Sequence, residues 1–151
     1  MLSNPLPRVL CVDDDEDSRV MLTTLLRLAL IEAKAVGTAA QALSLIQTER
    51  FDLYLLDSRL PDLDGFELCR RMRAFDLHMP IVFFSGAAYE ADKKRGIAAG
   101  ADAYLVKPDL DGLVGSIKRF VAQPESPTAK IIPFIRKTSS SAPFNFEPAV
   151  A

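Results

Sequence analysis

Five short apolar segments, each followed by a segment with helical character, restrict most strongly how this chain can fold. The apolar runs are mostly uninterrupted, which is typical of strands that are covered on both faces of a parallel sheet. We assign them to residues 8–12, 34–36, 51–56, 81–84 and 103–106. Strands that alternate with helices form βαβ units with right-handed crossovers. The alternation therefore predicts a doubly wound α/β domain built on a five-stranded parallel sheet.

The helices between these strands are expected at residues 18–30, 38–49, 65–73, 89–99 and 109–122. Thr38 has the side chain of an N-cap residue. Asp15 and the two acidic residues after it precede the first helix, where the helix dipole favours negative charge, so we assign them to capping. Gly96 and Gly100 are expected to weaken the later turns of the fourth helix.

Length and charge limit the classes of function. With 151 residues, 49% of them hydrophobic, the chain is large enough for one well-packed core. A net charge of -2 without a basic stripe predicts no direct nucleic-acid contact. No apolar run has membrane-spanning length and the start lacks a secretory signal, so we expect no membrane insertion and a cytoplasmic protein. Cys11 and Cys69 lack the close Cys or His neighbours of metal sites, and we interpret them as buried thiols.

Polar side chains follow four of the predicted strands at the point where each strand ends. Asp13 and Asp14 follow the first strand, Asp57 the third, Ser85 the fourth and Lys107 the fifth. Each residue alone has an ordinary interpretation as a cap, a loop start or a surface charge. In a doubly wound sheet, however, the carboxyl ends of the strands line the ligand crevice. The combination therefore predicts a functional site at this edge.

Carboxylates gathered at one edge need a cation. Two of them within about 4 Å repel by roughly 4 kcal/mol at an effective dielectric constant of 20. Oxygen ligands with no His or Cys nearby suit Mg²⁺, which completes its coordination with water and phosphate oxygens. An Asp carboxylate such as Asp57 can be the nucleophile that takes a phosphoryl group. Lys107 and Ser85 would then contact the phosphoryl oxygens, where charge lies in the transition state.

Four motifs in this order resemble those of the receiver domain of two-component response regulators, as represented by chemotaxis response regulators. They are Val12-Asp13-Asp14-Asp15, Leu56-Asp57 followed by Leu60-Pro61-Asp62-Leu63-Asp64-Gly65, Phe84-Ser85-Gly86, and Tyr104-Leu105-Val106-Lys107-Pro108. The resemblance covers about residues 7–122, with order, spacing and placement at strand ends all matching. It implies a flavodoxin-like (βα)5 fold with strand order 2-1-3-4-5.

The resemblance also implies a phosphoacceptor and its metal site. Asp57 corresponds to the phosphoacceptor, and Asp13 and Asp14 to acids that hold Mg²⁺ together with Asp57. The backbone carbonyl of Arg59 is implied as a further metal ligand. The long cationic side chain of Arg59 stands beside the phosphoryl group, where it can shield that group or steer water, and this affects the lifetime of the phosphorylated form.

Two further residues correspond to the switch of the family, and a third to its phosphate-contacting lysine. Ser85 is implied as the switch hydroxyl, Tyr104 as the switch aromatic residue and Lys107 as the lysine that contacts the phosphate. The Lys107–Pro108 bond is often cis in the family. A lone Tyr in a strand is usually a half-buried aromatic residue, so only the pairing with Ser85 gives Tyr104 a functional interpretation. Phosphorylation is expected to draw Ser85 toward the phosphate and to let Tyr104 turn inward.

The composition changes after the predicted domain of residues 1–123. Residues 124–151 hold five of the ten prolines and a run of serines, so we expect a Pro/Ser-rich, mostly flexible C-terminal extension without a DNA-binding helix pattern. Within it, Ile131, Ile132, Phe134 and Ile135 form an apolar cluster. This cluster is predicted either to dock on the domain or on a partner's sheet edge, or to be part of a plain tether.

The leading functional hypothesis is a phosphoacceptor signalling module. A histidine kinase or phosphotransfer protein donates the phosphoryl group to Asp57 with Mg²⁺, which changes a surface that binds a downstream protein partner or output domain. Such a module is not an enzyme beyond assisting its own phosphorylation and slow dephosphorylation. The alternatives are an intermediate phosphoryl carrier and a Mg²⁺-dependent phosphohydrolase, the latter disfavoured because Arg59 stands where a second acid is needed. A flavodoxin-like cofactor binder is disfavoured because the loops lack a Gly/Ser/Thr-rich phosphate cradle.

Overall fold

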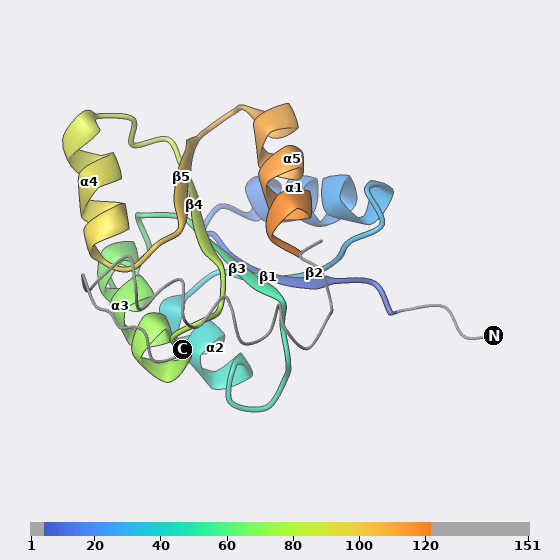
Figure 1. Ribbon diagram of the computed structural model, residues 1–151, viewed down its shortest axis with the longest axis horizontal. Coiled ribbons are helices and arrows are strands. Elements are labelled where there is room, and N and C mark those ends of the chain that lie inside the picture. Colours follow the sequence, from blue (N-terminus) through green and yellow to red (C-terminus); the bar gives the residue numbers. More distant parts are fainter. Residues whose placement is uncertain (1–4, 122–151) are drawn as a thin grey trace, which may run out of the picture. The chain divides into compact units, whose positions relative to one another are not determined.

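The computed structural model describes residues 5–121, which form a five-stranded parallel sheet with helices on both faces (Figure 1). The strands lie in the order β2-β1-β3-β4-β5. Their bounds are β1 (Arg8–Val12), β2 (Glu32–Val36), β3 (Leu53–Leu56), β4 (Ile81–Ser85) and β5 (Ala103–Val106). Every pairing between neighbouring strands is parallel. The predicted doubly wound fold and its strand order are therefore confirmed.

The helices of the described residues divide between the two faces of the sheet. Their bounds are α1 (Glu16–Leu28), α2 (Ala39–Leu45), α3 (Gly65–Phe75), α4 (Glu90–Ala98) and α5 (Leu110–Val121). In Figure 1, α1 and α5 lie on one face, whereas α2, α3 and α4 lie on the other. This division is what right-handed crossovers produce when the chain starts in the middle of the sheet and extends it toward both edges.

Two apolar cores lie on the two faces, because successive side chains of a strand point to opposite sides of the sheet. Leu10 and Val12 of β1 pack into the core that includes residues of α2 and α3. Val9 and Cys11 pack into the core that includes residues of α1 and α5. All five residues of β4 are at most 2% exposed, so this strand is covered on both faces. Its carboxyl end is thus held firmly in place.

Two helices begin with the predicted caps. The Asp15 carboxylate accepts a hydrogen bond from the Ser18 backbone N–H at 2.8 Å, so α1 starts at Glu16, two residues before the predicted start. Thr38 is the N-cap of α2, and its Oγ1 accepts a hydrogen bond from the Gln41 backbone N–H at 3.1 Å. Side-chain oxygens at these positions satisfy backbone N–H groups that lack a partner within the helix.

Some boundaries differ from the predicted ones for local reasons, and the turn before β2 has an unusual backbone conformation. Helix α2 ends at Leu45 and not near Glu49, because the next backbone N–H groups bond to carbonyls three residues back and close 3₁₀-type turns. Strand β2 begins at Glu32, before the predicted start, because it pairs in register with β1 from its first residue. Between α1 and β2, Leu30 takes the left-handed conformation with φ 63°, which a C-terminal glycine would adopt with less strain.

The loop after β3 is tied to α2 through Asp62. Its Oδ1 accepts a hydrogen bond from the Ala39 N–H and its Oδ2 one from the Ala40 N–H, both at 2.9 Å. These two bonds hold the pKa of the Asp62 carboxyl below its usual value. The contact fixes the loop that begins at Asp57, and therefore helps to position the predicted site.

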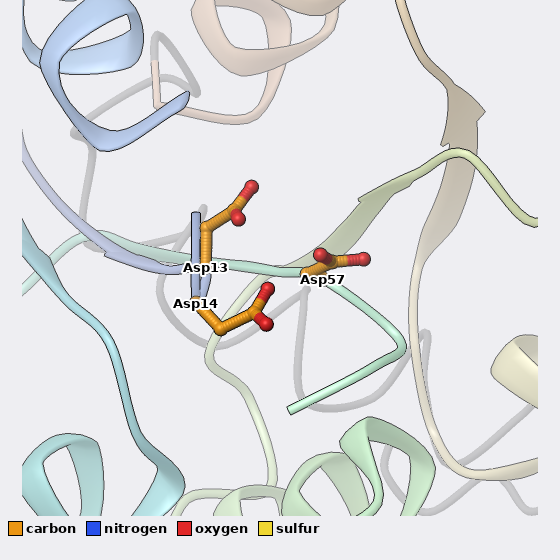
Figure 2. Close-up of side chains that lie close together, drawn as sticks. All are labelled: Asp13, Asp14 and Asp57. Atoms are coloured by element: carbon orange, nitrogen blue, oxygen red, sulfur yellow. The ribbon is translucent and has the colours of Figure 1, made fainter. Parts of the chain in front are cut away.

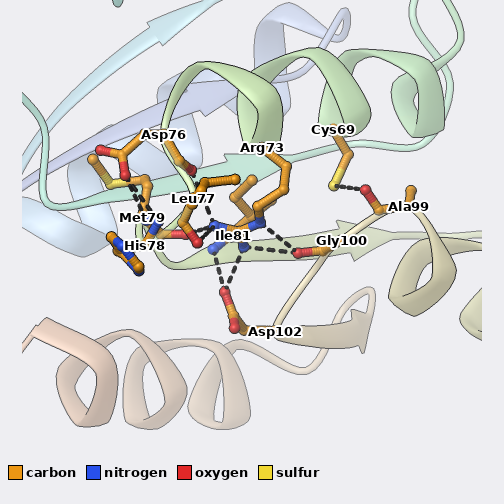
Figure 3. A network of polar contacts seen from close by, with 10 residues as sticks. All are labelled: Cys69, Arg73, Asp76, Leu77, His78, Met79, Ile81, Ala99, Gly100 and Asp102. Atoms are coloured by element: carbon orange, nitrogen blue, oxygen red, sulfur yellow. Dashed lines mark hydrogen bonds and ion pairs between the residues drawn. The ribbon is translucent and has the colours of Figure 1, made fainter. Parts of the chain in front are cut away.

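A network around Arg73 holds the opposite end of β4 (Figure 3). The Arg73 guanidinium donates to four backbone carbonyls, those of Asp76, Leu77, Met79 and Gly100. It also forms an ion pair of 2.9 Å with Asp102, whose Oδ2 accepts a hydrogen bond from the Ile81 N–H at 3.0 Å. One side chain of α3 thus joins the loop before β4 to the loop before β5.

No helix within residues 5–121 combines the length and hydrophobicity that crossing a bilayer requires.

Two predictions concern residues outside this range. They are the domain boundary at residues 123–124 and the docking of the apolar cluster within residues 130–137, and both lie outside the described residues.

Candidate functional site

The predicted acidic residues meet where β1 and β3 end side by side. Val12 of β1 pairs with Leu56 of β3 in register, so Asp13 and Asp57 follow paired residues directly. The Asp57 N–H donates to the Val12 carbonyl at 2.9 Å, which continues the ladder past the ends of both strands. The positions of Asp13 and Asp57 are therefore set by β1 and β3, which are neighbours in the sheet.

Asp13, Asp14 and Asp57 form a compact cluster (Figure 2). Each contributes a carboxylate oxygen, and these three oxygens lie within 4.8 Å of one another. Asp13 is 2% exposed and the Asp57 side chain is 11% exposed, whereas Asp14 lies open to solvent. The cluster thus has a buried side and an open side, as a site that takes up a small ion or ligand requires.

Lys107 brings one positive charge into this cluster from the end of β5. Its Nζ lies 2.7 Å from Asp13 Oδ2 and 3.6 Å from Asp57 Oδ2. Burial lowers the Lys107 pKa, but the hydrogen bond to Asp13 and the charge of Asp57 outweigh it, and the pKa is raised overall. The Lys107–Pro108 peptide bond is cis, as the resemblance implied. Three carboxylates and one ammonium group leave a formal charge of -3 + 1 = -2, which favours a divalent cation.

The environment of Asp57 disfavours the ionised form of its carboxyl group and raises its pKa. Desolvation by burial raises the pKa of its carboxyl, and the nearby Asp13 raises it further. Lys107 lowers the pKa, as do hydrogen bonds from the Arg59 backbone and the Ser85 side chain, but the net shift is upward. An ionised carboxylate with little water around it is a more reactive nucleophile than a hydrated one.

Asp13 is held by bonds that the sequence did not reveal. Arg19 of α1 donates a hydrogen bond from Nη1 to the Asp13 carbonyl at 2.8 Å. The Asp13 Oδ1 accepts a hydrogen bond from the Asp15 N–H at 3.0 Å. A basic residue one helical turn and a half after an acidic pair carries no clear signal in the sequence, so the role of Arg19 was not predicted.

Ser85 lies at the end of β4 and is 1% exposed. Its Oγ lies 2.6 Å from the Oγ of Ser58, which is 4% exposed, and accepts a hydrogen bond from the Ala87 N–H at 3.1 Å. Ser58 was not among the predicted site residues. Its signal in the sequence is a hydroxyl directly after the strand-ending Asp57, although nothing there indicates that the hydroxyl meets Ser85.

Tyr104 of β5 lies against α4 and the loop before it. Its hydroxyl donates to the Ala87 carbonyl at 2.6 Å, and its ring stacks on Phe83 with 5.4 Å between ring centroids. A Cβ on Gly96 would lie only 2.7 Å from the Tyr104 ring. Gly96 was predicted only to weaken α4, whereas the structure shows that it makes room for Tyr104. The predicted turning of Tyr104 on phosphorylation stays a prediction.

The loop after Asp57 packs closely against Gly65 at the start of α3. The Gly65 N–H donates to the Ser58 carbonyl at 3.0 Å, and a Cβ at Gly65 would collide with the Asp57 carbonyl. Arg59 is exposed and, together with Ser58, borders a cavity of about 440 Å³. Arg95 of α4 lines the same cavity. The use of the Arg59 carbonyl as a metal ligand stays a prediction.

Comparisons with known proteins agree with this geometry. The family described as the response regulator receiver domain matches residues 9–118. The DNA-binding response regulator MtrA of Mycolicibacterium paratuberculosis is 40% identical over 101 residues, which cover 67% of this chain and 44% of MtrA. The transcriptional regulatory protein PrrA of Mycobacterium bovis is 40% identical over 113 residues, which cover 74% of this chain and 48% of PrrA. The chain thus spans about half the length of these curated relatives.

A solved structure is also similar to this chain. The receiver domain of the sensor histidine kinase PA1611 from Pseudomonas aeruginosa matches with a TM-score of 0.71 and 28% identity, over 78% of this chain and 98% of that one. That structure has a magnesium ion coordinated in its active-site cleft. The sheet order, the acidic cluster and the matched residues lead to one conclusion: the chain belongs to the family of response regulator receiver domains.

Proposed function

We propose that this chain is a phosphorylation-controlled signalling module in which Asp57 accepts the phosphoryl group. The observation that carries this proposal is the meeting of three carboxylates and one lysine ammonium at the carboxyl end of the sheet. Asp57 is the member of the cluster that is both shielded from water and reachable, since its side chain is 11% exposed. Its carboxylate oxygen attacks the phosphorus atom of the donor, the bond between that phosphorus and the donor breaks, and the donor leaves with the bonding electrons, so that the product is an aspartyl phosphate.

Mg²⁺ is the cation that this cluster fits. The donor set consists of carboxylate oxygens, with no thiolate or imidazole among the grouped residues, and such oxygens suit a hard divalent ion. Asp13, Asp14 and Asp57 would hold the ion together with the Arg59 carbonyl. In that position a bound ion would supply positive charge next to the incoming phosphoryl group. The magnesium ion in the PA1611 receiver domain supports this assignment.

Lys107 and Ser85 would bind the phosphoryl oxygens, and Tyr104 would report the change to the surface formed by α4, β5 and α5. Moving a two-state equilibrium from 1:99 to 99:1 takes about 5.5 kcal/mol of differential binding. One neutral hydrogen bond contributes only about 0.5 to 1.5 kcal/mol, so the Ser85 hydroxyl needs the charge of Lys107 beside it. The bond from Tyr104 to Ala87 links β5 to the loop that follows Ser85.

A histidine kinase or phosphotransfer protein is the proposed phosphodonor, and a protein partner or output domain is the proposed target. MtrA and PrrA are named as a DNA-binding and a transcriptional regulator, and this chain covers less than half of each. The absence of direct nucleic-acid binding therefore stays a prediction from charge. We also propose a cytoplasmic location and a slow loss of the phosphoryl group that the chain itself assists, as the membership in the receiver-domain family suggests.

The first prediction is that a small phosphodonor phosphorylates Asp57 only when Mg²⁺ is present. The dianionic group cannot form beside Asp13 and Asp14 without a compensating cation. Intact-mass spectrometry should show a single phosphate adduct, which chelator prevents and Asp57→Asn abolishes. Phosphate released continuously from the donor, in place of a stoichiometric adduct, would instead favour the phosphohydrolase.

Asp15→Asn is the matched control. Asp15 lies next to the acidic pair but caps α1, and Asn caps a helix about as well as Asp does. The control variant should carry the adduct as the parent does. An adduct that persists in Asp57→Asn, or that forms equally in chelator, would contradict the assignment of Asp57.

A further inference from the structure

Two hydroxyl groups, those of Ser58 and Ser85, meet inside the protein beside Asp57. Their oxygens are 2.6 Å apart, and the two residues are 4% and 1% exposed. They come from different parts of the fold, since Ser58 lies in the loop after β3 and Ser85 is the last residue of β4. We propose that Ser58 is a positioning residue that turns the Ser85 hydroxyl proton toward the group carried by Asp57. This inference rests on the proposed function and concerns how Ser85 performs its part of it.

The direction of the hydrogen bond follows from counting protons. Each hydroxyl has one proton to donate and two lone pairs that accept. The Ser85 oxygen accepts the Ala87 N–H at 3.1 Å, and Ser58 occupies the other side of it at 2.6 Å. If Ser58 donates, both lone pairs of Ser85 are used and its proton remains available for Asp57. If Ser85 donated to Ser58 instead, the Ser85 proton would not be available to the Asp57 carboxylate.

Burial makes the first arrangement the stable one. Within residues 5–121, Ser85 is the hydrogen-bond partner that the structure gives the Ser58 hydroxyl. A buried donor without an acceptor is costly, so Ser58 gives its proton to Ser85. The Ser85 side chain lowers the pKa of the Asp57 carboxyl, as a donor to its ionised form does. The chain of donors therefore runs from Ser58 through Ser85 to Asp57.

The backbone of Ser58 is held well enough to serve this purpose. Its carbonyl accepts the Gly65 N–H at 3.0 Å, and Gly65 packs so closely that an added Cβ would meet the Ser58 backbone. A donor whose position is fixed before the reaction loses no freedom when the phosphoryl group arrives. Ser58 itself does not contact the phosphoryl group, because its hydroxyl is engaged by Ser85. It acts through Ser85 alone.

The test compares Ser58→Thr with Ser58→Val, two side chains of the same shape of which only Thr keeps the hydroxyl. We expect the Thr variant to be phosphorylated by a small phosphodonor about 3 to 10 times faster than the Val variant, because one hydrogen bond in the transition state is at stake. The same pair is then made in a Ser85→Ala background. There the Thr and Val variants should react at equal rates, since the residue through which Ser58 acts is gone.

The outcomes separate this inference from the proposed function. Equal rates for the Thr and Val variants with Ser85 present would overturn the role of Ser58 while leaving Asp57 as phosphoacceptor. A difference that persists in the Ser85→Ala background would mean a packing effect and would also overturn it. No adduct on the parent protein would end the proposed function, and the inference with it. Urea unfolding of all four variants shows whether each is folded under the assay conditions.

Discussion

Asp57 carries its charge at a position where burial disfavours that charge. Its pKa is raised because desolvation outweighs the favourable effect of Lys107, and the neighbouring Asp13 adds to the shift. The same burial that costs stability keeps water away from the carboxylate and from any phosphoryl group bound to it. The protein thus gives up some folding stability at the residue that we propose to react, as is common at functional sites.

This cost predicts that Asp57→Asn stabilises the protein in chelator. The folded state holds the Asp57 proton more tightly than the unfolded chain, in which the pKa is near 3.8. Ionisation therefore lowers the free energy of unfolding of the parent as the pH rises from that value through the raised folded pKa. Urea unfolding should give equal midpoints for parent and variant below pH 3.8, a growing advantage for Asn above it, and a constant advantage at neutral pH.

Asp15→Asn again provides the control. Asp15 is exposed and its pKa is lowered by the hydrogen bond from Ser18, so removing its charge should not raise stability at any pH. If Asp57→Asn unfolded at a lower urea concentration than the parent at pH 7.5 in chelator, the proposed destabilisation by the buried charge of Asp57 would be wrong.

At the scale of residues, the sequence predicts side chains that follow strand ends and misses those that act across loops. Asp13, Asp57, Ser85 and Lys107 were found because parallel strands bring their carboxyl ends together. Ser58 was missed because its partner lies 27 residues further along the chain. A contact between residues so far apart in the sequence cannot be recognised from the sequence alone and becomes visible only in the folded structure.

At the scale of elements, α4 is shaped by the strand next to it. Gly96 is buried in α4, and a Cβ there would lie 2.7 Å from the Tyr104 ring and 3.1 Å from the Phe83 ring. Gly115 in α5 is also within a helix, but a Cβ there would meet nothing within 4 Å. The two glycines are equal in intrinsic helix propensity and differ in what surrounds them.

We therefore expect Gly96→Ala and Gly115→Ala to change stability in opposite directions. Ala favours the helix by about 0.5 to 1 kcal/mol at either position. At Gly96, crowding against two aromatic rings costs about 1 to 3 kcal/mol and reverses the sign. Urea unfolding measures both changes. Gly96→Ala should also shift the NMR signals of Tyr104, and a stabilised Gly96→Ala variant with an unmoved Tyr104 ring would refute this account.

Periodicity predicts which elements form, and local hydrogen bonds decide where they end. All ten strands and helices of the described residues were expected in the right order. The end of α2 near Leu45 could not be predicted, because it depends on a choice between α-helical and 3₁₀-type bonds of similar strength. The packing role of Gly96 could not be predicted for a different reason. The sequence indicates that a glycine weakens a helix, but only the structure shows which side chains pack against it.

At the scale of the whole molecule, β4 connects two polar centres. Its first residue, Ile81, bonds to the Asp102 carboxylate of the Arg73 network, and its last residue, Ser85, lies in the candidate site. Four steps of about 3.3 Å place these ends about 13 Å apart along the strand. Loops join the sheet at both ends, and a separate set of hydrogen bonds holds each end.

Arg73→Lys should destabilise the protein by about 2 kcal/mol. Lysine has no planar fork, so it cannot serve several carbonyls and the Asp102 carboxylate at once, and buried acceptors lose their donors. Arg71→Lys, on the same helix, is the control, because Arg71 is exposed and forms an ion pair with Glu67 four residues before it. Its effect should stay within about 0.5 kcal/mol. Thermal or urea unfolding compares the two, and equal effects would contradict the role given to Arg73.

The length of β4 has a consequence for how such a chain changes over generations. Substitutions more than about 7 to 10 Å apart that share no partner usually have additive effects on stability. Substitutions around Arg73 can therefore adjust stability to the temperature at which the organism lives. Selection on signalling acts separately on Ser58, Ser85 and Tyr104 at the other end. A homologous protein can therefore become more heat-stable while its response to phosphorylation stays the same, because stability and signalling depend on residues at different ends of β4.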